Sequence, residues 1–268
     1  MIRTTLVLAT LAWMSAQAVA QEKAEPSGYS DEELAKKLAN PVASLVSVPL
    51  QLNYDCCYAP DDNGGWLLNV QPVMPFALND NLNLIVRTIL PLHYREGRSA
   101  FDGEGFGFGD TTQSFFFAPP AKNGLTLAAG PVIYWPTGSE GYESGKWGAG
   151  ITGLALKQQG HVSYGILANH IWSVAGAENR PDISSTFLQP FYNYTWPDTT
   201  SFLINLESTY DWEHDQWSVP LNTGISHIYN FSGQKVSLGA QARAWLERPD
   251  GGPDWGLRVI ATFLFPAG

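Results

Sequence analysis

Residues 235–247 read KVSLGAQARAWLE, a stretch that alternates between two kinds of side chain. Apolar residues occupy the even positions from Val236 to Ala244, whereas Ser237, Gln241 and Arg243 occupy odd positions. A period of two is the pattern of a β-strand with one apolar and one polar face. Runs of about ten such residues, separated by turn residues, are typical of β-barrels that cross a membrane.

The same alternation recurs along most of the chain after residue 44. Connections that follow odd-numbered runs are mostly long and polar, whereas those that follow even-numbered runs are short, as expected when one barrel end faces outside. We therefore predict an all-β fold, a transmembrane up-and-down antiparallel β-barrel of about twelve strands with a short N-terminal helix. The twelve runs cover residues 44–54, 66–76, 82–94, 109–118, 125–136, 147–157, 162–173, 185–196, 200–212, 217–229, 235–247 and 255–265.

The composition also favours a chain that meets lipid. Hydrophobic residues make up 44% of the 268 residues, and charged residues only 15%, against roughly 25% in soluble globular domains. A soluble β-sandwich is the alternative, but it needs more surface charge than this sequence offers. The formal charge of −10 argues against a nucleic-acid partner, which would call for a basic face.

Aromatic residues mark the two expected membrane interfaces. One group of tryptophans falls next to the long connections and predicts an aromatic girdle at one barrel end; it comprises Trp66, Trp135, Trp147, Trp172, Trp212, Trp217 and Trp255. Phe76, Trp196, Phe202 and Phe265 could form the weaker belt at the opposite end. The last run contains Phe263-Leu264-Phe265, much like the final strand of outer-membrane barrels.

The N-terminal region predicts export followed by a short helix. Arg3, an apolar run over 6–14 and Ala18-Val19-Ala20 fit a signal peptide over residues 1–20, and the apolar run is too short for a membrane anchor. Ser30 and Glu33 form a capping-box pattern, which places a helix inside the segment 21–43, before a barrel over 44–268. We accordingly predict localisation in the outer membrane, with membrane lipid as a partner.

The two cysteines, Cys56 and Cys57, are adjacent and lie on the first long connection. Two lone cysteines make no disulfide framework. Either a reducible pair or two free thiols fits the sequence, and a metal site is less favoured because no histidine is nearby. If the long connections lie outside the cell, both cysteines are external.

Two sequence features could suggest an enzyme. A phospholipase site near the outer leaflet needs a Ser–His pair there, but His161-Val162-Ser163 falls at a short turn, on the opposite side. The acidic cluster with His214 at 211–215 reads as a solvated loop tip, with a weak divalent-cation site as the alternative. We predict that the protein is not an enzyme and has no catalytic residues, metal or cofactor.

The interior of the predicted barrel carries polar residues that can be aligned. If the hairpins are symmetric about 198, 214.5, 232.5 and 250.5, one row of inward residues crosses five strands, with Glu207 about 10 Å from Arg243 across Asn222. A packed polar network and a substrate-lining constriction fit this pattern equally well. The row contains Gln189, Glu207, Asn222, Arg243 and Arg258, and Gln51, Gln71 and Arg87 are inward in the first three runs.

Several segments carry a family resemblance: LANPVASL at 38–45, GFGDT at 107–111, GKWGAG at 145–150, LANHIWS at 167–173, FLQPF at 187–191, ESTYDWE at 207–213 and PDGGPDWGLR at 249–258. The sequences of these segments resemble those of a family of bacterial outer-membrane β-barrels. Its members are catalogued as transporters, some under the name neuromedin U, and are similar to barrels of the MetA phenol-degradation type. The resemblance implies passive uptake of small solutes. A non-conducting structural or surface-interaction barrel and an outer-membrane hydrolase are the alternatives.

Overall fold

The computed structural model describes residues 29–59, 62–95 and 105–265, so the predicted signal peptide over 1–20 lies outside the described residues. The elements in chain order are α2 (Asp31–Leu38), β1 (Val46–Tyr58), β2 (Asn63–Val70), β3 (Val73–Asn79), β4 (Leu82–Arg95), β5 (Gly105–Phe108), β6 (Thr111–Ala118), β7 (Leu125–Trp135), β8 (Lys146–Gln159), β9 (Val162–Gly176), β10 (Ser184–Thr195), β11 (Ser201–Leu206), β12 (Ser208–Asp211), β13 (Gln216–Ser218), β14 (Pro220–Phe231), β15 (Gln234–Trp245) and β16 (Trp255–Phe265).

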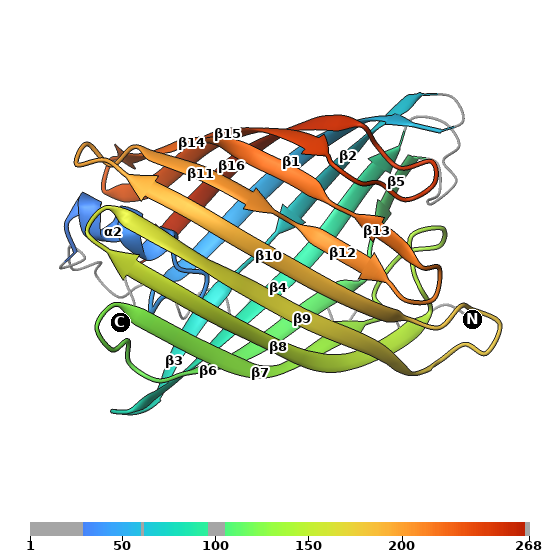
Figure 1. The fold of residues 1–268 in the computed structure, drawn as a ribbon, viewed down its shortest axis with the longest axis horizontal. Helices are drawn as coiled ribbons and strands as arrows, with labels where there is room; N and C mark the ends of the chain where they lie inside the picture. Colours follow the sequence, from blue (N-terminus) through green and yellow to red (C-terminus); the bar gives the residue numbers. More distant parts are fainter. Residues whose placement is uncertain (1–28, 60–61, 96–104, 266–268) are drawn as a thin grey trace, which may run out of the picture.

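Within these residues the sixteen β segments build twelve barrel strands, because four of the strands are interrupted. The pairs β2–β3, β5–β6, β11–β12 and β13–β14 each continue one strand. Pro72 lies at the first interruption and has no N–H to donate to a neighbour. All neighbouring strands are antiparallel, and β1 pairs with β16 to close the barrel (Figure 1). The predicted fold class, a closed antiparallel barrel of twelve strands with one short helix, is confirmed.

The strands extend further into the long connections than the sequence pattern predicts. The connection expected over 55–65 is largely strand, because Cys56 pairs with Trp255 and Tyr58 pairs with Asn63. Similarly, β5 begins at Gly105, four residues before the predicted run. In Figure 1 the short turns and α2 gather at the left end of the barrel, and the long connections lie at the right.

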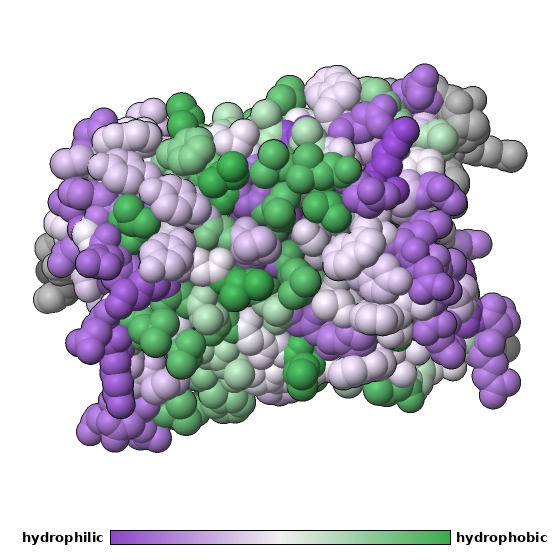
Figure 2. Space-filling view, viewed as in Figure 1, coloured by the Kyte–Doolittle hydropathy of each residue, from purple (hydrophilic) through white to green (hydrophobic). Residues whose placement is uncertain are grey.

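The outer surface of the barrel is apolar across its middle. Along β15, Leu238, Ala240 and Ala242 are exposed, whereas Gln241 and Arg243 are buried. Figure 2 shows hydrophobic residues across the centre of this face and hydrophilic residues toward both ends. A closed barrel leaves no open sheet edge, so its backbone groups are satisfied within a bilayer. These features identify a membrane-spanning barrel of the outer-membrane type.

The predicted aromatic girdle is present on that surface. Six of its seven tryptophans are at least 40% exposed, and they stand near the long-connection end. Aromatic rings contact one another there, as between Tyr54 and Trp66, with ring centroids 4.9 Å apart. At the short-turn end, Phe76, Trp196 and Phe265 are also exposed. An amphipathic ring is most stable at the boundary between lipid and water, so the two belts bracket the lipid-facing zone.

Helix α2 forms where the capping box predicts it. The Ser30 hydroxyl accepts from the Glu33 backbone N–H at 3.2 Å, and Glu33 accepts from the Ser30 backbone N–H at 2.8 Å. Among the described residues, no helix is long and apolar enough to cross a membrane.

The helix is docked against the inner wall at the short-turn end. Leu34 and Ala35 are buried in a cluster with Leu45, Ile228 and Leu264. Polar contacts add to this packing: Lys235 forms an ion pair with Asp31 at 2.8 Å, and the Gln158 side chain donates to the Lys36 carbonyl at 2.8 Å. The apolar face of α2 therefore holds the helix inside one mouth of the barrel.

Candidate functional site in the barrel interior

The register of the last hairpins decides which polar residues meet. Asn222 pairs with Arg243, as predicted, and the β10 hairpin has the predicted centre, since Phe191 pairs with Asn205. The other two hairpins differ by two residues from the symmetric prediction. Asn222 lies opposite Asn205 rather than Glu207, and Gln241 rather than Arg243 lies opposite Arg258.

The turn after β12 explains one of these shifts. Asp211 pairs with Gln216, and its side chain accepts from the backbone N–H groups of Glu213 and His214 at 2.9 and 3.3 Å. This compact turn sets the register of the hairpin. A two-residue shift keeps every side chain on the same face of its strand because the strand period is two. The predicted alignment of the five residues in one row across the strands is therefore wrong, but each of them still lies on the inward face.

A buried ion pair joins Arg258 and Glu207 across the barrel interior. The Arg258 Nη2 donates to Glu207 Oε2 at 2.7 Å, and its Nη1 donates to Oε1 at 2.8 Å. The Arg258 side chain is 3% exposed and that of Glu207 is 19% exposed. Gln189 adds a longer contact to Glu207 at 3.4 Å. Two parallel hydrogen bonds fix the carboxylate in orientation as well as in distance.

Arg243 is bound to a different carboxylate from the one predicted. Its Nη1 donates to the two oxygens of Asp55 at 2.7 and 3.0 Å, so Arg243 does not face Glu207 across Asn222 as its partner. Asn53 joins the two ion pairs, because its Oδ1 accepts from Arg243 at 3.0 Å and from Arg258 at 2.6 Å. The two pairs form one continuous network.

Four members of this network were not among the predicted site residues. Asp55 was assigned to a connection, and Asn53 was not singled out. Nor were Asn205, which accepts from the Asn222 amide at 2.8 Å, and Gln241, which accepts from Arg258 at 3.3 Å. The alternation itself contains a signal for them, since Asn53 and Asp55 continue the odd positions of β1 and Gln241 shares the face of Arg243. Their neighbours across the barrel, however, depend on the register and on β1 reaching Tyr58.

A chain of two amides runs from this network to Arg87. The Arg87 Nη2 donates to Gln71 Oε1 at 2.8 Å, and the Gln71 Nε2 donates to Gln51 Oε1 at 2.9 Å. In the reversed orientation of its amide, the Gln51 oxygen accepts from Arg258 Nε at 2.9 Å and from Nη2 at 2.8 Å. Gln51, Gln71 and Arg87 therefore lie in one file that leads from β4 to the ion pairs, and the Gln51 oxygen accepts from Gln71 in one amide orientation and from Arg258 in the other.

The opposite part of the wall presents apolar side chains to the interior. Ile85, Phe116, Leu156 and Leu167 are at most 2% exposed and pack in one cluster with Val42, which lies between α2 and β1. This cluster belongs to β3, β4 and β6–β9, together with Phe187 and Phe191 at its border. The interior is thus divided into a charged wall and an apolar wall.

A cavity of about 250 Å³ lies between α2 and the barrel wall. Leu38 and Leu45 line it on the side of the helix and the segment that follows it, and Gln71, Arg87 and Gln189 line it toward the charged network. Of the predicted lumen residues, Gln71, Arg87 and Gln189 therefore border the cavity, whereas Asn222 is fully buried.

Ser163 and His214, the residues that could suggest a hydrolase, lie in different surroundings. Ser163 is 3% exposed and accepts from Gln158 at 3.0 Å, so its hydroxyl is turned away from the lipid-facing wall. His214 contacts the Asp211 carboxylate at 2.8 Å on an exposed turn. Within the described ranges, no cluster of three or more His, Cys, Asp or Glu side chains has the geometry to hold a metal ion.

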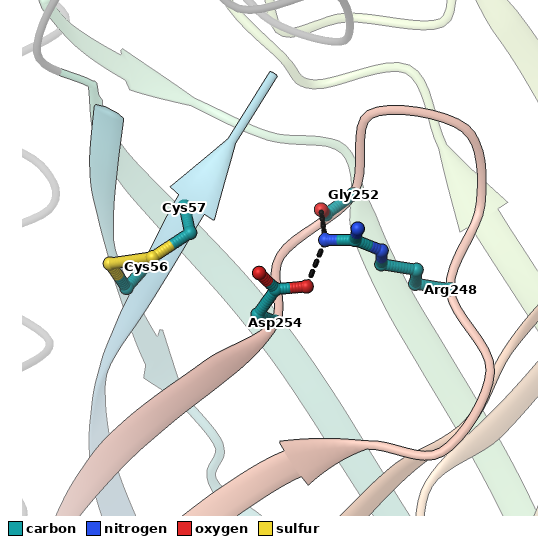
Figure 3. Close-up of a disulfide and its surroundings, with 5 residues drawn as sticks. All are labelled: Cys56, Cys57, Arg248, Gly252 and Asp254. Carbon is teal, nitrogen blue, oxygen red and sulfur yellow. Dashed lines mark hydrogen bonds and ion pairs between the residues drawn. A yellow bond between two sulfur atoms is a disulfide. The ribbon is translucent and has the colours of Figure 1, made fainter. Parts of the chain in front are cut away.

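Cys56 and Cys57 are joined by a disulfide bond at the end of β1 (Figure 3). Of the two arrangements that the sequence allows, the structure therefore has the joined pair. The Asp254 backbone N–H donates to the Cys56 carbonyl at 3.1 Å. Arg248 forms an ion pair with Asp254 and donates to the Gly252 carbonyl at 3.3 Å. The disulfide thus lies beside the 248–254 loop at the long-connection end.

Comparison with known proteins adds a fold relationship. No family model and no curated protein matches this sequence. An outer membrane channel from Pseudomonas putida F1 is 15% identical, with a TM-score of 0.65 over 91% of this chain and 100% of that chain. OmpT, an outer membrane protein of Vibrio cholerae, is 10% identical, with a TM-score of 0.43 over 82% and 98%. LpxR from Salmonella typhimurium is 10% identical, with a TM-score of 0.41 over 82% and 100%. The first similarity supports the outer-membrane barrel fold.

Proposed function

We propose that this protein is a passive outer-membrane channel or uptake barrel for small solutes. The observation that carries the proposal is the inward network of two ion pairs, Arg258 with Glu207 and Arg243 with Asp55, inside a closed membrane-spanning barrel. Taking four charged groups out of water is costly, and apolar residues of similar size would fill the interior at no such cost. A polar constriction for a solute gives these charges a function.

Two further points support a transport function. The sequence segments that resemble transport barrels of the phenol-degradation type extend over most of the described chain, and the fold is similar to that of an outer membrane channel. By analogy with the phenol-degradation barrels, small aromatic solutes are the first class to test.

In this proposal α2 controls entry at the short-turn end. The helix is held by the burial of Leu34 and Ala35 and by the Lys235–Asp31 ion pair, whose side chains are 23% and 46% exposed. Exposed ion pairs contribute only about 0–1 kcal/mol, so apolar packing dominates the docking. A shift of α2 would enlarge the cavity beneath it.

Conductance in planar bilayers tests the channel directly. We expect the purified mature protein to conduct, and we expect Leu34→Asp, or removal of residues 21–43, to raise the conductance because the helix no longer docks. Leu238→Ala, on the lipid-facing side, should leave the conductance unchanged. If none of these proteins conducts, the non-conducting structural or surface-interaction barrel is the better assignment.

Ion selectivity tests the role of the charged network. Arg243→Ala and Arg258→Ala remove positive charge from the pore wall, so both should shift a conducting barrel toward cations. Leu238→Ala is again the control. A barrel that conducts with unchanged selectivity in both arginine variants would contradict the placement of the constriction at this network.

A further inference from the structure

We propose that the cavity between α2 and the barrel wall is a binding site for a small organic anion, with Arg87 holding its carboxylate. The site borders the ion-pair network, because Gln189 and Gln241 line it, but the four ion-paired side chains of the network lie outside its lining. Binding is an equilibrium property, so a barrel that does not conduct could still hold the anion.

The charge of the cavity is the first argument. Its charged lining residues, among those the structure describes, are Arg87 and Lys37, and no Asp or Glu side chain borders it. The whole chain, in contrast, carries a net charge of −10. Hydroxyl groups such as those of Ser47 and Ser201 also line the space. A cavity with two cations, several hydroxyl donors and no acidic side chain favours an anionic guest.

The partners of Arg87 are the second argument. Within the described part of the chain, its guanidinium donates to a neutral amide, Gln71 Oε1, and forms no ion pair. Arg243 and Arg258, in contrast, each form an ion pair with a carboxylate. Arg87 therefore differs from Arg243 and Arg258 in having a neutral side-chain partner, and it is the one of these three arginines that lines the cavity.

The amide chain between Arg87 and Arg258 strengthens this argument. Both ends of the chain are donors, and the two amides between them, Gln51 and Gln71, each carry one donor and one acceptor end. In one orientation of the Gln51 amide, the Gln71 oxygen accepts from Arg87 and the Gln51 oxygen accepts from Gln71, so the Gln51 nitrogen faces the donor groups of Arg258. In the reversed orientation the Gln51 oxygen accepts from Arg258, and the Gln51 nitrogen then lies 2.9 Å from the Gln71 nitrogen, which is also a donor. Rotating Gln71 as well turns its nitrogen toward Arg87. An added acceptor beside Arg87 would resolve this mismatch.

The remaining lining defines the class of anion. Leu38, Leu45 and Val73 provide an apolar part of the lining, and Val73 is the cross-strand neighbour of Arg87. The cavity volume of about 250 Å³ suits a single small organic molecule rather than a large ligand. Arginine binds a carboxylate with two parallel hydrogen bonds. These properties together fit a small carboxylate with a compact apolar body.

Calorimetric titration of the full-length protein in detergent tests the proposal, with benzoate as the probe and benzamide as its neutral counterpart. We expect benzoate to bind at least about tenfold more tightly than benzamide, because only benzoate pairs with the guanidinium. Inorganic phosphate, which lacks an apolar body, should bind more weakly than benzoate. Equal binding of benzoate and benzamide, or phosphate binding as tight as that of benzoate, would overturn the assignment.

Substitutions locate the site. Arg87→Gln should weaken benzoate binding at least about tenfold and remove its preference over benzamide, whereas Arg87→Lys should retain part of the preference. Arg248→Gln, which removes an exposed arginine at the other barrel end, should bind benzoate as the unmodified protein does. Unchanged binding in Arg87→Gln would refute the site.

A second variant, on the helix side of the cavity, keeps the proposal testable if Arg87→Gln does not fold. Lys37→Gln lies on α2 rather than on a barrel strand, and it should weaken benzoate binding by only about threefold, because the Lys37 Nζ lies over the Tyr29 ring, 4.2 Å from its centroid, at the helix side of the cavity. If Arg87→Gln does not fold, this variant and the benzoate–benzamide comparison in the unmodified protein decide the outcome. No effect of Lys37→Gln together with no preference for benzoate would then reject the proposal.

Discussion

The two walls of the barrel interior are built from the same strand pattern but with opposite chemistry. On one wall, β1 and β14–β16 direct Asn53, Asn222, Arg243 and Arg258 inward, and each is at most 8% exposed. On the other, β4 and β6–β9 direct residues such as Phe116 and Leu156 inward, with 1% and 0% exposure. Both walls are closely packed.

The difference lies in how each wall responds to a lost side chain. Apolar packing is non-directional, and its loss leaves a cavity whose cost depends on how well the surroundings relax. A buried ion pair is directional, and removing one partner leaves an uncompensated charge. The charged wall should therefore be the less tolerant of the two, and unfolding measurements can test this.

The largest effect is expected for Arg258→Ala. Glu207, whose side chain is 19% exposed, would lose both of its short hydrogen bonds and the cation that pairs with it, at a cost of about 3–5 kcal/mol in the free energy of unfolding. Guanidinium titration of the protein in lipid vesicles measures this loss. Arg248→Ala, which breaks an exposed pair, is the matched control and should cost about 0–1 kcal/mol. Equal losses in the two variants would remove the distinction between the buried network and a surface pair.

On the apolar wall, Leu156→Ala should destabilise by about 2–5 kcal/mol, since a fully buried side chain is truncated next to Leu154 and Leu167. The same titration reports it, and Leu238→Ala, which truncates an exposed leucine, serves as the control. A cost for Leu156→Ala no larger than for Leu238→Ala would mean that the apolar cluster is loosely packed.

Combining Arg258→Ala with Leu156→Ala asks whether the two walls act independently. The two residues belong to separate clusters and share no contact among those described. Their effects on the free energy of unfolding should therefore add within about 0.5 kcal/mol. A larger coupling energy would show that the interior responds as a single unit.

The smallest effect concerns the ion pair at 2.9 Å between Lys146, the first residue of β8, and Asp182, whose side chain is 67% exposed on the connection before β10. Hydrogen bonds from Lys146 and Ser173 lower the pKa of Asp182 below its ordinary value. A lowered pKa contributes stability that is present above the unfolded-state pKa and is lost as the pH falls through the folded-state pKa. The melting temperature of Asp182→Asn should be slightly below that of the unmodified protein at neutral pH, and the difference should vanish in strong acid. A difference that persists there would assign the effect to something other than ionisation.

Much of the barrel could be predicted from local pattern alone. The twelve runs correspond to the twelve strands, and the Ser30–Glu33 capping box corresponds to the start of α2. Alternation and capping involve residues close in sequence, and their physical causes, the pleat of a strand and the free N–H groups of a helix end, are local. The inward parity of Arg243 and Arg258 follows from the same cause.

The contacts within the interior were decided by the tertiary structure. The partner of Arg243 is Asp55, from a strand 188 residues away in sequence, and the pairing requires both barrel closure and the two-residue shift at the β15–β16 hairpin. Where both faces of a strand are apolar, alternation also does not show which face points into the barrel. The cluster around Ile85 and Phe116 is therefore recognised only in the closed barrel. The sequence by itself determined strands, helix and the two faces of each strand, because these depend on neighbouring residues. Only the closed barrel decided which side chains meet, because register is set by turn geometry and by pairing between distant strands.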